Sequence, residues 1–372
     1  MQKVAQSWLI LDLTKSSFFL GLDDFLGQLP ILLFTVVGGV IADRHDRRRL
    51  LLSSQYVQMT TAFTLAALVW TGYVRIEFVL MLSCLTGFAQ AFGGPAYQSL
   101  IPTLVQKQHL PNAIALNSIQ FNLSRIFGSL LAGAALAAFG TAICFGLNGL
   151  SFIVVIFALL ALSVKHIRPA EHKPMLQEMR GGFTYMRSEP TLMALTVLAC
   201  LTTFLGLPLL TLLPVFARDI FHGDIGLYSR MMAFSGAGSV VGALIVAWLG
   251  RFKHMGMTLL VMGVIFGVLL VGFSTSRVLW VSEVLLFLAG GSVMMLTAMT
   301  SSLVQLIVPD HLRGRVVSIY MVAFRGGMPL GSLAAGYVAS LTSVPIVLAG
   351  NGTLVSLMAI YFLTRSHGVR EL

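Results

Sequence analysis

The sequence has few charged residues for its length. Only 10% of its 372 residues are Asp, Glu, Lys or Arg, whereas 57% are hydrophobic. A soluble globular chain carries roughly 25% charged residues. This shortage of charge excludes an ordinary soluble domain and indicates a polytopic helical membrane protein.

Motifs that carry chemistry are absent as well. The sequence holds no Gly-x-x-x-x-Gly-Lys-Ser/Thr motif, which argues against nucleotide-driven transport. The three cysteines, Cys84, Cys144 and Cys200, lie inside apolar segments and do not indicate a disulfide framework. The eight histidines avoid the interiors of these segments, so we expect no intramembrane metal site. No nucleophile, base or metal cluster is recognisable, and we expect neither an enzyme nor a cofactor.

A cleavable signal peptide and a nucleic-acid patch are also missing. No basic segment followed by a cleavage site opens the chain. The formal net charge is +10, but the basic residues are spread over short loops and are not interleaved with aromatic residues. We interpret them as topology signals and expect no nucleic-acid partner.

Apolar runs of membrane-spanning length fill the chain. A spanning helix needs about 20 residues. Met1–Leu13 is shorter and has the character of the outer half of a first helix, so we expect an N-terminal truncation or a start at an internal methionine. The other expected spans are Phe18–Ala42, Leu50–Gly72, Phe78–Leu104, Asn112–Ala138 and Thr141–Ser163, then Thr191–Ala217, Gly226–Gly250, Met255–Ser274, Leu279–Ile307, Val316–Ala339 and Pro345–Thr364.

The basic residues alternate as this span count requires. Most of them fall on one predicted side of the membrane, and only Lys15, Arg75, Arg218, Arg230 and Arg277 fall on the other. Lysine and arginine mark the cytoplasmic side. We therefore expect the polar linker Lys165–Pro190 and the tail Arg365–Leu372 to be cytoplasmic.

Internal repetition divides the chain into two halves. Ser118 and Arg125 recur as Ser318 and Arg325 at a nearly constant offset, which indicates a duplicated six-helix unit. We predict an all-α membrane protein with two six-helix bundles in pseudo-two-fold relation and an incomplete first helix. The expected domains are an N-terminal bundle (1–163), a linker (164–190), a C-terminal bundle (191–364) and a tail (365–372).

Two pairs of glycines have the spacing of close helix contacts. They are Gly238-x-x-x-Gly242 and Gly327-x-x-x-Gly331. Such pairs serve either static packing or, where two halves meet, sliding of one half against the other.

The loop after the span Phe18–Ala42 has a characteristic spacing. Its signature residues are Gly39, Asp43, Arg44, Arg47 and Arg48. The spacing resembles the loop between the second and third helices of the major facilitator superfamily, although Asp46 stands where that family usually has glycine. Glycine there permits a positive φ, and Asp is among the few other residues that tolerate it.

The resemblance implies a role for Asp43. In the family, a contact between the two halves forms at this level when the cytoplasmic side is closed and breaks when it opens. Asp43 would then be a latch for the outward-facing state, with Arg47 and Arg48 holding its geometry. The alternative is that Asp43 only caps the loop and offsets the arginines.

A second loop motif precedes the span Val316–Ala339. It consists of Pro309, Asp310, Arg313, Gly314 and Arg315. The motif resembles the cytoplasmic loop of the secretion-effector and drug-exporter branch of the superfamily, which includes the enterobactin exporter and macrolide efflux proteins. The resemblance covers essentially the whole chain and implies a plasma-membrane location, in the inner membrane of a bacterium.

A polar stripe crosses the middle of the span Asn112–Ala138. Ser118, Asn122 and Arg125 are four and three residues apart and so share one helix face. A polar face at mid-membrane must meet protein or water rather than lipid. Arg125 either lines a central cavity, where it meets an anionic substrate group or an acidic side chain, or locks two helices together. Its counterpart Arg325 lies on a less polar face.

Few acidic residues are placed to carry protons. Asp23 and Asp24 lie near the outer end of the second span, Asp12 near that of the first, and Glu283 near that of the tenth. We take Asp12 and Glu283 as the coupling candidates. Uncharged residues that serve either cavity contacts or helix packing are Gln90, Tyr97, Thr297, Ser301 and Gln305.

These observations and the resemblance predict a secondary active exporter of amphipathic small molecules, drug-like or siderophore-like, that works by alternating access. Proton antiport is implied by the resemblance alone, since Ser83–Gly94 holds no arginine and Gly128 is followed by Ser129 instead of proline. The expected partners are a small-molecule substrate, protons and the lipid bilayer, and we expect a monomer. The alternatives are an uptake carrier or lipid flippase of the same fold, and a non-transporting receptor or scaffold.

Overall fold

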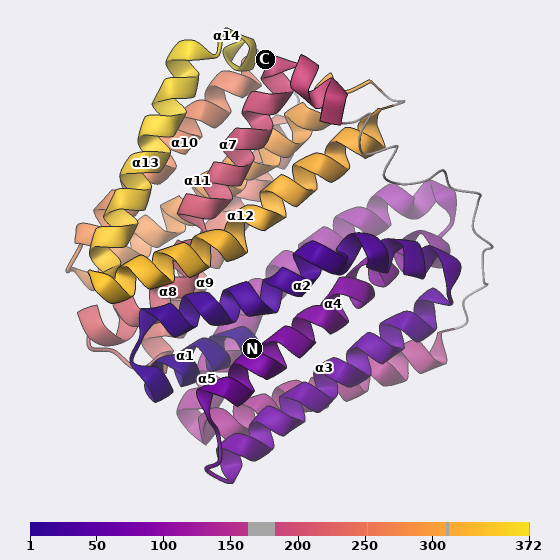
Figure 1. Cartoon of the computed structure of the whole chain (residues 1–372), viewed down its shortest axis with the longest axis vertical. Helices are drawn as coiled ribbons and strands as arrows, with labels where there is room; N and C mark the ends of the chain where they lie inside the picture. The colour runs from indigo at the N-terminus through magenta and orange to yellow at the C-terminus, as the bar shows by residue number, and fades with distance from the viewer. Residues whose placement is uncertain (163–182, 251, 310–311, 372) are drawn as a thin grey trace. The chain divides into compact units, whose positions relative to one another are not determined.

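The computed structural model describes residues 1–162, 183–250, 252–309 and 312–371 (Figure 1). All regular elements within these ranges are helices. They form two compact units: unit 1 holds residues 1–162 and 223–230, and unit 2 holds residues 183–222 and 231–371. The domain limits expected from the sequence stay a prediction.

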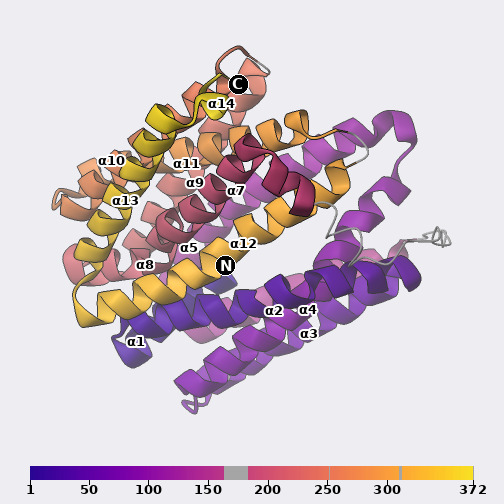
Figure 2. The same cartoon turned by 45° about the horizontal axis from the view of Figure 1, so that its top comes forward.

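Unit 1 is a bundle of five main helices. They are α1 (Gln2–Thr14), α2 (Ser17–Arg44), α3 (Arg47–Trp70), α4 (Ile76–Leu104) and α5 (Leu110–Ala161), with the 3-10 turn η1 (Lys107–His109) before α5. The chain reverses between α1 and α2, where Lys15 adopts the left-handed conformation with φ 50°. α2 and α3 both pack on α4, and the three helices lie side by side in both views (Figures 1 and 2).

The 52-residue helix α5 is two helices joined at a kink. Gly140 inside it has φ 78° and ψ 177°, which is not helical. Glycine reaches this region without the steric cost that a Cβ atom imposes. The kink falls between the two expected spans Asn112–Ala138 and Thr141–Ser163, so the sequence had separated them at the right place.

A segment distant in sequence completes unit 1. Gly223–Arg230 leads into and begins α9 (Ile225–Leu249). The ring of Tyr228 stacks on that of Trp8 in α1, with the ring centroids 6.3 Å apart. A Cβ atom added to Gly133 of α5 would lie 2.4 Å from the side chain of Ser229. Glycine at position 133 therefore permits α5 to approach this segment closely.

Unit 2 contains the second series of helices. They are α7 (Pro190–Gly206), α8 (Pro208–Val215), the π-helical turn η2 (Phe216–Ile220), the remainder of α9, α10 (Met255–Thr275), α11 (Leu279–Ile307), α12 (Arg313–Leu341), α13 (Val344–Arg365) and α14 (His367–Arg370). α10 packs on α11 and α13, and α12 packs on α7. The core between them includes the buried Leu192, Leu259, Met299 and Val316.

The expected span Thr191–Ala217 lies within the apolar segment Pro190–Ile220, which is long enough to cross a membrane, but it is not one continuous helix. α7 ends at Gly206, and Pro208 begins α8 at its first position. Proline has no N–H group, so it cannot continue the hydrogen bonding of a helix but fits its first turn. The apolar pattern runs through this break, and the pattern alone therefore predicted a single span.

Nine segments of the described chain are long and apolar enough to cross a membrane. Three further helical segments complete the order of spans expected from the sequence. They are the shorter α1, α3, which begins with three arginines, and the first part of α5. The prediction of an all-α membrane protein is confirmed.

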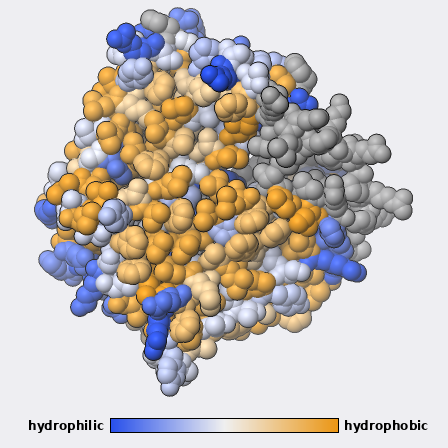
Figure 3. Space-filling model, in the orientation of Figure 1, coloured by the Kyte–Doolittle hydropathy of each residue, from blue (hydrophilic) through white to orange (hydrophobic). Residues whose placement is uncertain are grey.

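The surfaces of both units are strongly apolar on the face drawn in Figure 3. Large exposed side chains include Trp248, which is 85% exposed, and Trp70, which is 75% exposed. Soluble proteins rarely expose contiguous apolar patches of more than a few hundred Å². These surfaces fit lipid rather than water.

The glycine pairs hold helices together inside unit 2. A Cβ atom added to Gly238 would lie 1.8 Å from the carbonyl oxygen of Phe287, and one added to Gly331 would lie 1.9 Å from that of Phe204. The contacts join α9 to α11 and α12 to α7, within one unit. They represent static packing, the first of the two alternatives for these pairs.

Candidate functional site

Three helices of unit 1 bring five polar side chains together. Lys3 and Gln6 come from α1, Asp23 and Asp24 from α2, and Ser83 from α4. Four of the five residues are less than 10% exposed, namely Gln6 (7%), Asp23 (8%), Asp24 (4%) and Ser83 (9%). We call these five residues the buried charge cluster.

Hydrogen bonds fix the carboxylate of Asp23. The amide Nε2 of Gln6 donates to Asp23 Oδ1 at 2.7 Å and to Ser83 Oγ at 2.5 Å. The hydroxyl of Ser83 donates in turn to the same Asp23 oxygen, also at 2.5 Å. One oxygen of Asp23 thus accepts two hydrogen bonds from two other helices, which locks its position.

Asp24 is held differently. Its Oδ1 forms an ion pair with the ammonium group of Lys3, whereas its Oδ2 is buried and has no hydrogen-bond partner in the described part of the chain. A buried polar atom without a partner costs about 1–3 kcal/mol. The Asp24 side chain is 2% exposed but that of Lys3 is 54% exposed. One oxygen of Asp24 therefore has no partner among the described residues, while the Lys3 side chain has room to move.

The cluster lies well inside the expected membrane. Asp24 is seven residues beyond Ser17, the first residue of α2, which places it about 10 Å along a helix that must cross roughly 30 Å. Charged residues at such depth are costly and usually functional. With all three ionisable groups charged the cluster carries one net negative charge, and one added proton makes it neutral.

The sequence reasoning missed this cluster. Asp23 and Asp24 were assigned to the outer end of a span, and Lys3 was not considered. A signal was nevertheless present: Lys3 is 11 residues before the end of α1 and Asp24 is seven after the start of α2. In a helical hairpin these distances differ by about one helical turn, or about 6 Å in depth, which the long lysine side chain can span, so opposite charges there predict a pair.

The two predicted coupling residues lie elsewhere. Asp12 is exposed near the end of α1, nine residues from Lys3, and does not join the cluster. Glu283 is 8% exposed in the first turns of α11, in unit 2. The structure therefore does not bring Asp12 to the charged residues of α2, and Glu283 belongs to the other unit.

Gln90 belongs to a polar seam between α3 and α4. It is exposed, and its Nε2 donates to Oε1 of the buried Gln58 at 3.1 Å. Gln58 donates to Ser54 Oγ at 3.1 Å, and Ser54 donates to the carbonyl oxygen of Ala89 at 2.7 Å. Nearby on α4, the hydroxyl of Tyr97 donates to Asn117 of α5 at 2.5 Å. The hydrogen bond to Gln58 agrees with helix packing and the exposed position agrees with a cavity contact, so both alternatives for Gln90 stay predictions.

The two predicted arginines are described to different extents. The backbone at Ser118, Asn122 and Arg125 is helical within α5, but their side chains lie outside the described residues, so the stripe stays a prediction. Arg325 is described: it is exposed near the middle of α12. On α11 the other polar candidates form local bonds, Gln305 to Ser301 at 3.3 Å and Thr297 to the carbonyl oxygen of Val293 at 2.8 Å.

The arginines of the first loop motif tie helix ends together. Arg47 donates to the carbonyl oxygen of Ser99 in α4 at 3.0 Å. Arg48 donates from Nε to the carbonyl oxygen of Leu159 at 2.6 Å and from its terminal nitrogen to that of Leu160. A cation that binds the last carbonyl groups of α5 also interacts favourably with the negative end of that helix.

Asp46 in this loop does not adopt the positive φ that glycine would permit there. Its φ is −63° and its ψ is 108°, which is an extended conformation open to any residue. Its carboxylate instead accepts from the backbone N–H groups of Arg48 at 2.9 Å and Arg49 at 3.3 Å. Asp46 is the N-cap of α3, and this role explains why a residue other than glycine stands there.

Parts of both loop motifs lie outside the described residues. In the first motif the side chains of Asp43 and Arg44 are not among the described residues. In the second motif the same is true of Asp310 and position 314. Gly39 is half-buried, and a Cβ atom added to it would meet nothing within 4 Å. Pro309 precedes α12, whose first turn carries the exposed Arg313 and the half-buried Arg315.

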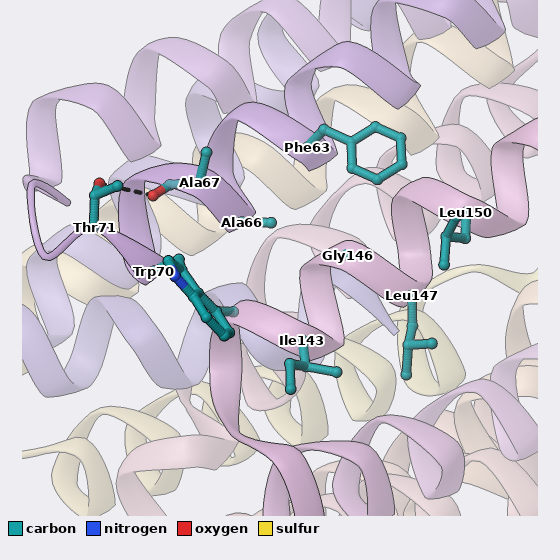
Figure 4. A pocket seen from close by; sticks show the side chains of 10 residues that line it. Phe63, Ala66, Ala67, Trp70, Thr71, Ile143, Gly146, Leu147 and Leu150 are labelled. Carbon is teal, nitrogen blue, oxygen red and sulfur yellow. Dashed lines mark hydrogen bonds between the residues drawn. The ribbon is translucent and has the colours of Figure 1, made fainter.

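An apolar groove of about 510 Å³ lies between α3 and the second part of α5 (Figure 4). Its lining residues are Phe63, Ala66, Ala67, Trp70, Thr71, Ala142, Ile143, Gly146, Leu147 and Leu150. The hydroxyl of Thr71 is occupied by the carbonyl oxygen of Ala67 at 2.8 Å. The groove shares no residue with the buried charge cluster, and it fits the lipid-like character of the surface.

Comparison with known proteins places these features in a family. The family described as transmembrane secretion effector matches residues 1–370. The chain is 25% identical to the staphyloferrin A transporter of Staphylococcus aureus, over 98% of this chain and 92% of that protein. It is also 25% identical to macrolide efflux protein A of Streptococcus pyogenes, over 93% of this chain and 87% of that protein.

A solved structure shows the same fold. The nucleoside transporter NupG superimposes with a TM-score of 0.73 at 15% identity, over 98% of this chain and 94% of that one. At this identity the likeness concerns the fold alone.

Proposed function

We propose that the chain exports amphipathic small molecules in exchange for protons. It belongs to the transmembrane secretion effector family of major facilitator transporters, and it is therefore a transporter and not an enzyme. Two similar proteins support export of a drug-like or siderophore-like substrate, since one is a macrolide efflux protein and the other transports staphyloferrin A. Alternating access of the two units to the two sides of the membrane is the mechanism that we propose with it.

The buried charge cluster is the observation that carries the proton-coupled part of the proposal. Asp24 has one oxygen on Lys3 and one without a partner. A proton on Asp24 removes the carboxylate charge and frees the ammonium group of Lys3. Loss of the proton restores the ion pair. The two forms differ in the contact between α1 and α2, and such a difference is what a bound proton needs in order to bias a conformational equilibrium.

Asp23 has a supporting part in this scheme. Its Oδ1 accepts hydrogen bonds from Gln6 of α1 and Ser83 of α4, so the Asp23 carboxylate keeps its position while Asp24 exchanges its partner. Two adjacent carboxylates with different partners thus provide one anchor and one exchanging group.

The loop motifs and the basic residues support the proposed orientation. We place Arg47–Arg49, the linker Lys165–Pro190 and the tail Arg365–Leu372 in the cytoplasm of a bacterium, with the chain in the inner membrane as a monomer. Asp43 is proposed as the latch of the outward-facing state. The bonds of Arg47 and Arg48 to α4 and α5 give the loop the rigidity that a latch requires.

Transport into everted membrane vesicles tests the proposal. Erythromycin and staphyloferrin A serve as probes, and a pH gradient with an acidic interior is imposed or collapsed with nigericin. We expect one of the probes to accumulate only with the gradient. The Asp24→Asn variant should lose this gradient-driven accumulation but keep probe-for-probe exchange, because exchange needs no net proton movement.

The rival coupling candidate is Asp12, and Asp12→Asn removes this exposed carboxylate from the same hairpin. It should accumulate the probe as the wild type does. Equal accumulation of the probe with and without the pH gradient would refute proton coupling. If the Asp24→Asn variant still accumulates the probe only with the gradient, the coupling residue is not Asp24.

A further inference from the structure

Arg325 is an exposed arginine in the middle of a span. It lies 12 residues after Arg313 and 16 before Leu341, the ends of α12, which is about 18 Å and 24 Å along the helix. The apolar segment Arg315–Leu341 is long enough to cross a membrane. Within the described chain, Arg325 has no hydrogen-bonding or ion-pair partner.

No described carboxylate of unit 2 lies at the depth of Arg325. The acidic residues in the described part of this unit are Glu189, Asp219, Glu283 and Glu371. All four stand within about one turn of a helix end, Glu283 being four residues into α11. An internal ion pair therefore does not explain the position of this arginine.

α12 exposes two different faces along its length. Its later half exposes large apolar side chains on one side, Leu330 (49%), Tyr337 (54%) and Leu341 (68%). Its earlier half exposes Arg325 together with Met321 (37%) and Val322 (42%). At 3.6 residues per turn the two sets point about 130° apart. The helix thus shows one face of lipid-like character and another that is amphipathic.

The amphipathic face requires a polar environment at mid-membrane. An arginine at the centre of a spanning helix is unfavourable in contact with lipid. The opposite side of α12 is occupied, because Tyr320 is buried in the core of unit 2 and Gly327 contacts Thr203 of α7. Arg325 therefore meets water or a bound solute.

A guanidinium group selects the chemistry of that solute. Its planar fork donates two parallel hydrogen bonds to a carboxylate, and such bonds are stronger than neutral ones. Met321 and Val322, one turn before Arg325, offer apolar contact beside it. Methionine adapts to apolar groups of different shape. A ligand of this face is an amphipathic carboxylate.

We propose that Arg325 binds the carboxylate of the transported substrate and that Met321 and Val322 contact the adjacent apolar part. This inference rests on the proposed function, because it names the chemical class of the exported molecule. The binding step needs no proton gradient, so it is measured separately from transport.

Two fluorescent probes that differ by one charge test the proposal. They are 11-(dansylamino)undecanoic acid and its methyl ester, titrated against the full chain in nanodiscs of zwitterionic phosphatidylcholine. We expect the wild type to bind the acid at least tenfold more tightly than the ester, the size of one charge-assisted hydrogen-bonded contact. Arg325→Gln should bind both probes equally, whereas Arg325→Lys should keep a reduced preference.

The matched control is Arg365→Gln, which removes an exposed arginine at the end of α13 in the same unit. It should keep the full preference for the acid. A second measurement follows maleimide labelling of a Val322→Cys variant, which the acid should slow and the ester should not. This measurement retains Arg325 and so decides the proposal if Arg325→Gln does not fold.

Each other outcome has a definite meaning. An equal affinity of the wild type for both probes, or an undiminished acid preference in Arg325→Gln, overturns the proposal. If the vesicle assay fails while the acid preference depends on Arg325, export is refuted and the anion site stands. If transport succeeds and Arg325 has no influence on the preference, the carboxylate inference is refuted alone.

Discussion

Unit 1 and unit 2 each place a basic residue at a depth inside the expected membrane, but the surroundings of the two residues differ. In unit 1, Lys3 is paired with a buried carboxylate, and a second carboxylate beside it is fixed by Gln6 and Ser83. In unit 2, Arg325 is exposed and has no partner among the described residues. In unit 1, an ion pair with Asp24 offsets the cost of placing a charge inside the membrane. In unit 2, this cost is offset by groups outside the described residues.

The difference separates two kinds of transport residue. A paired charge responds to anything that changes the charge of its partner, above all a proton. An unpaired charge responds to a ligand that brings the missing partner. The choice of side chain agrees with this division, since lysine is a compact point charge whereas arginine recognises carboxylates by shape.

Removing the cation of the pair should have the largest effect on stability. Lys3→Met leaves the Asp24 charge buried without compensation. A fully buried pair that loses one partner costs about 3–5 kcal/mol, and the 54% exposure of Lys3 reduces our expectation to about 2–4 kcal/mol. The free energy of unfolding in mixed micelles measures the effect.

A double variant and a control complete this test. Lys3→Met with Asp24→Asn should recover most of the loss, because the uncompensated charge is gone. Lys15→Met, at an exposed lysine just beyond α1, should change stability little. Equal losses in the single and the double variant would show that Lys3 acts through packing rather than through its charge.

Breaking the hydrogen bonds of Asp23 should have a smaller effect. Ser83→Ala removes the donor to Asp23 and the acceptor of Gln6, and a hydrogen bond to a charged group is worth about 1.5–3 kcal/mol. The same unfolding measurement applies. Ser53→Ala is the matched control, since this exposed hydroxyl bonds only within its own helix. If both variants lose the same stability, Asp23 is not anchored as described.

Unit 2 should be sensitive to backbone spacing instead of to charge. Gly331→Ala puts a methyl group where the carbonyl oxygen of Phe204 lies 1.9 Å away, and overpacking costs about 1–3 kcal/mol. Gly350→Ala is the control, because a Cβ atom there meets nothing within 4 Å. It should shift the unfolding free energy by no more than about 1 kcal/mol. A tolerated Gly331→Ala would mean that α12 and α7 separate more easily than their packing indicates.

The helices of both units could be predicted from the sequence, because hydropathy and helix length are local properties. The limits around Gly140 were right for this reason. The break at Pro208 was missed because the apolar pattern continues across it. Proline alone does not identify a break, since Pro30 and Pro95 lie inside continuous helices.

The candidate sites could be predicted only where they lie on one helix. Arg325 was identified from its repeat partner Arg125 and from its depth in a span. The buried charge cluster uses three helices, and Gln6 and Ser83 are 77 residues apart in the chain. No single-helix pattern connects them, and only the packing of α1, α2 and α4 brings them together.

The last prediction concerns Asp46, an acidic residue of unit 1 that we exclude from the comparison because its role is local. As the N-cap of α3 it accepts from the N–H groups of Arg48 and Arg49. Loss of an N-cap costs about 1 kcal/mol for alanine and a few tenths for glycine, while asparagine keeps the cap. Its contact with the Arg49 side chain, at 3.5 Å and with that side chain 87% exposed, should add little. We therefore expect the unfolding free energy to fall in the order Asp46→Asn, Asp46→Gly, Asp46→Ala. If the backbone here needed a positive φ, as the glycine usual in the family suggests, Asp46→Gly would be the most stable of the three. The order of Asn and Gly thus decides between a cap and a strained turn, and the observed φ of −63° favours the cap.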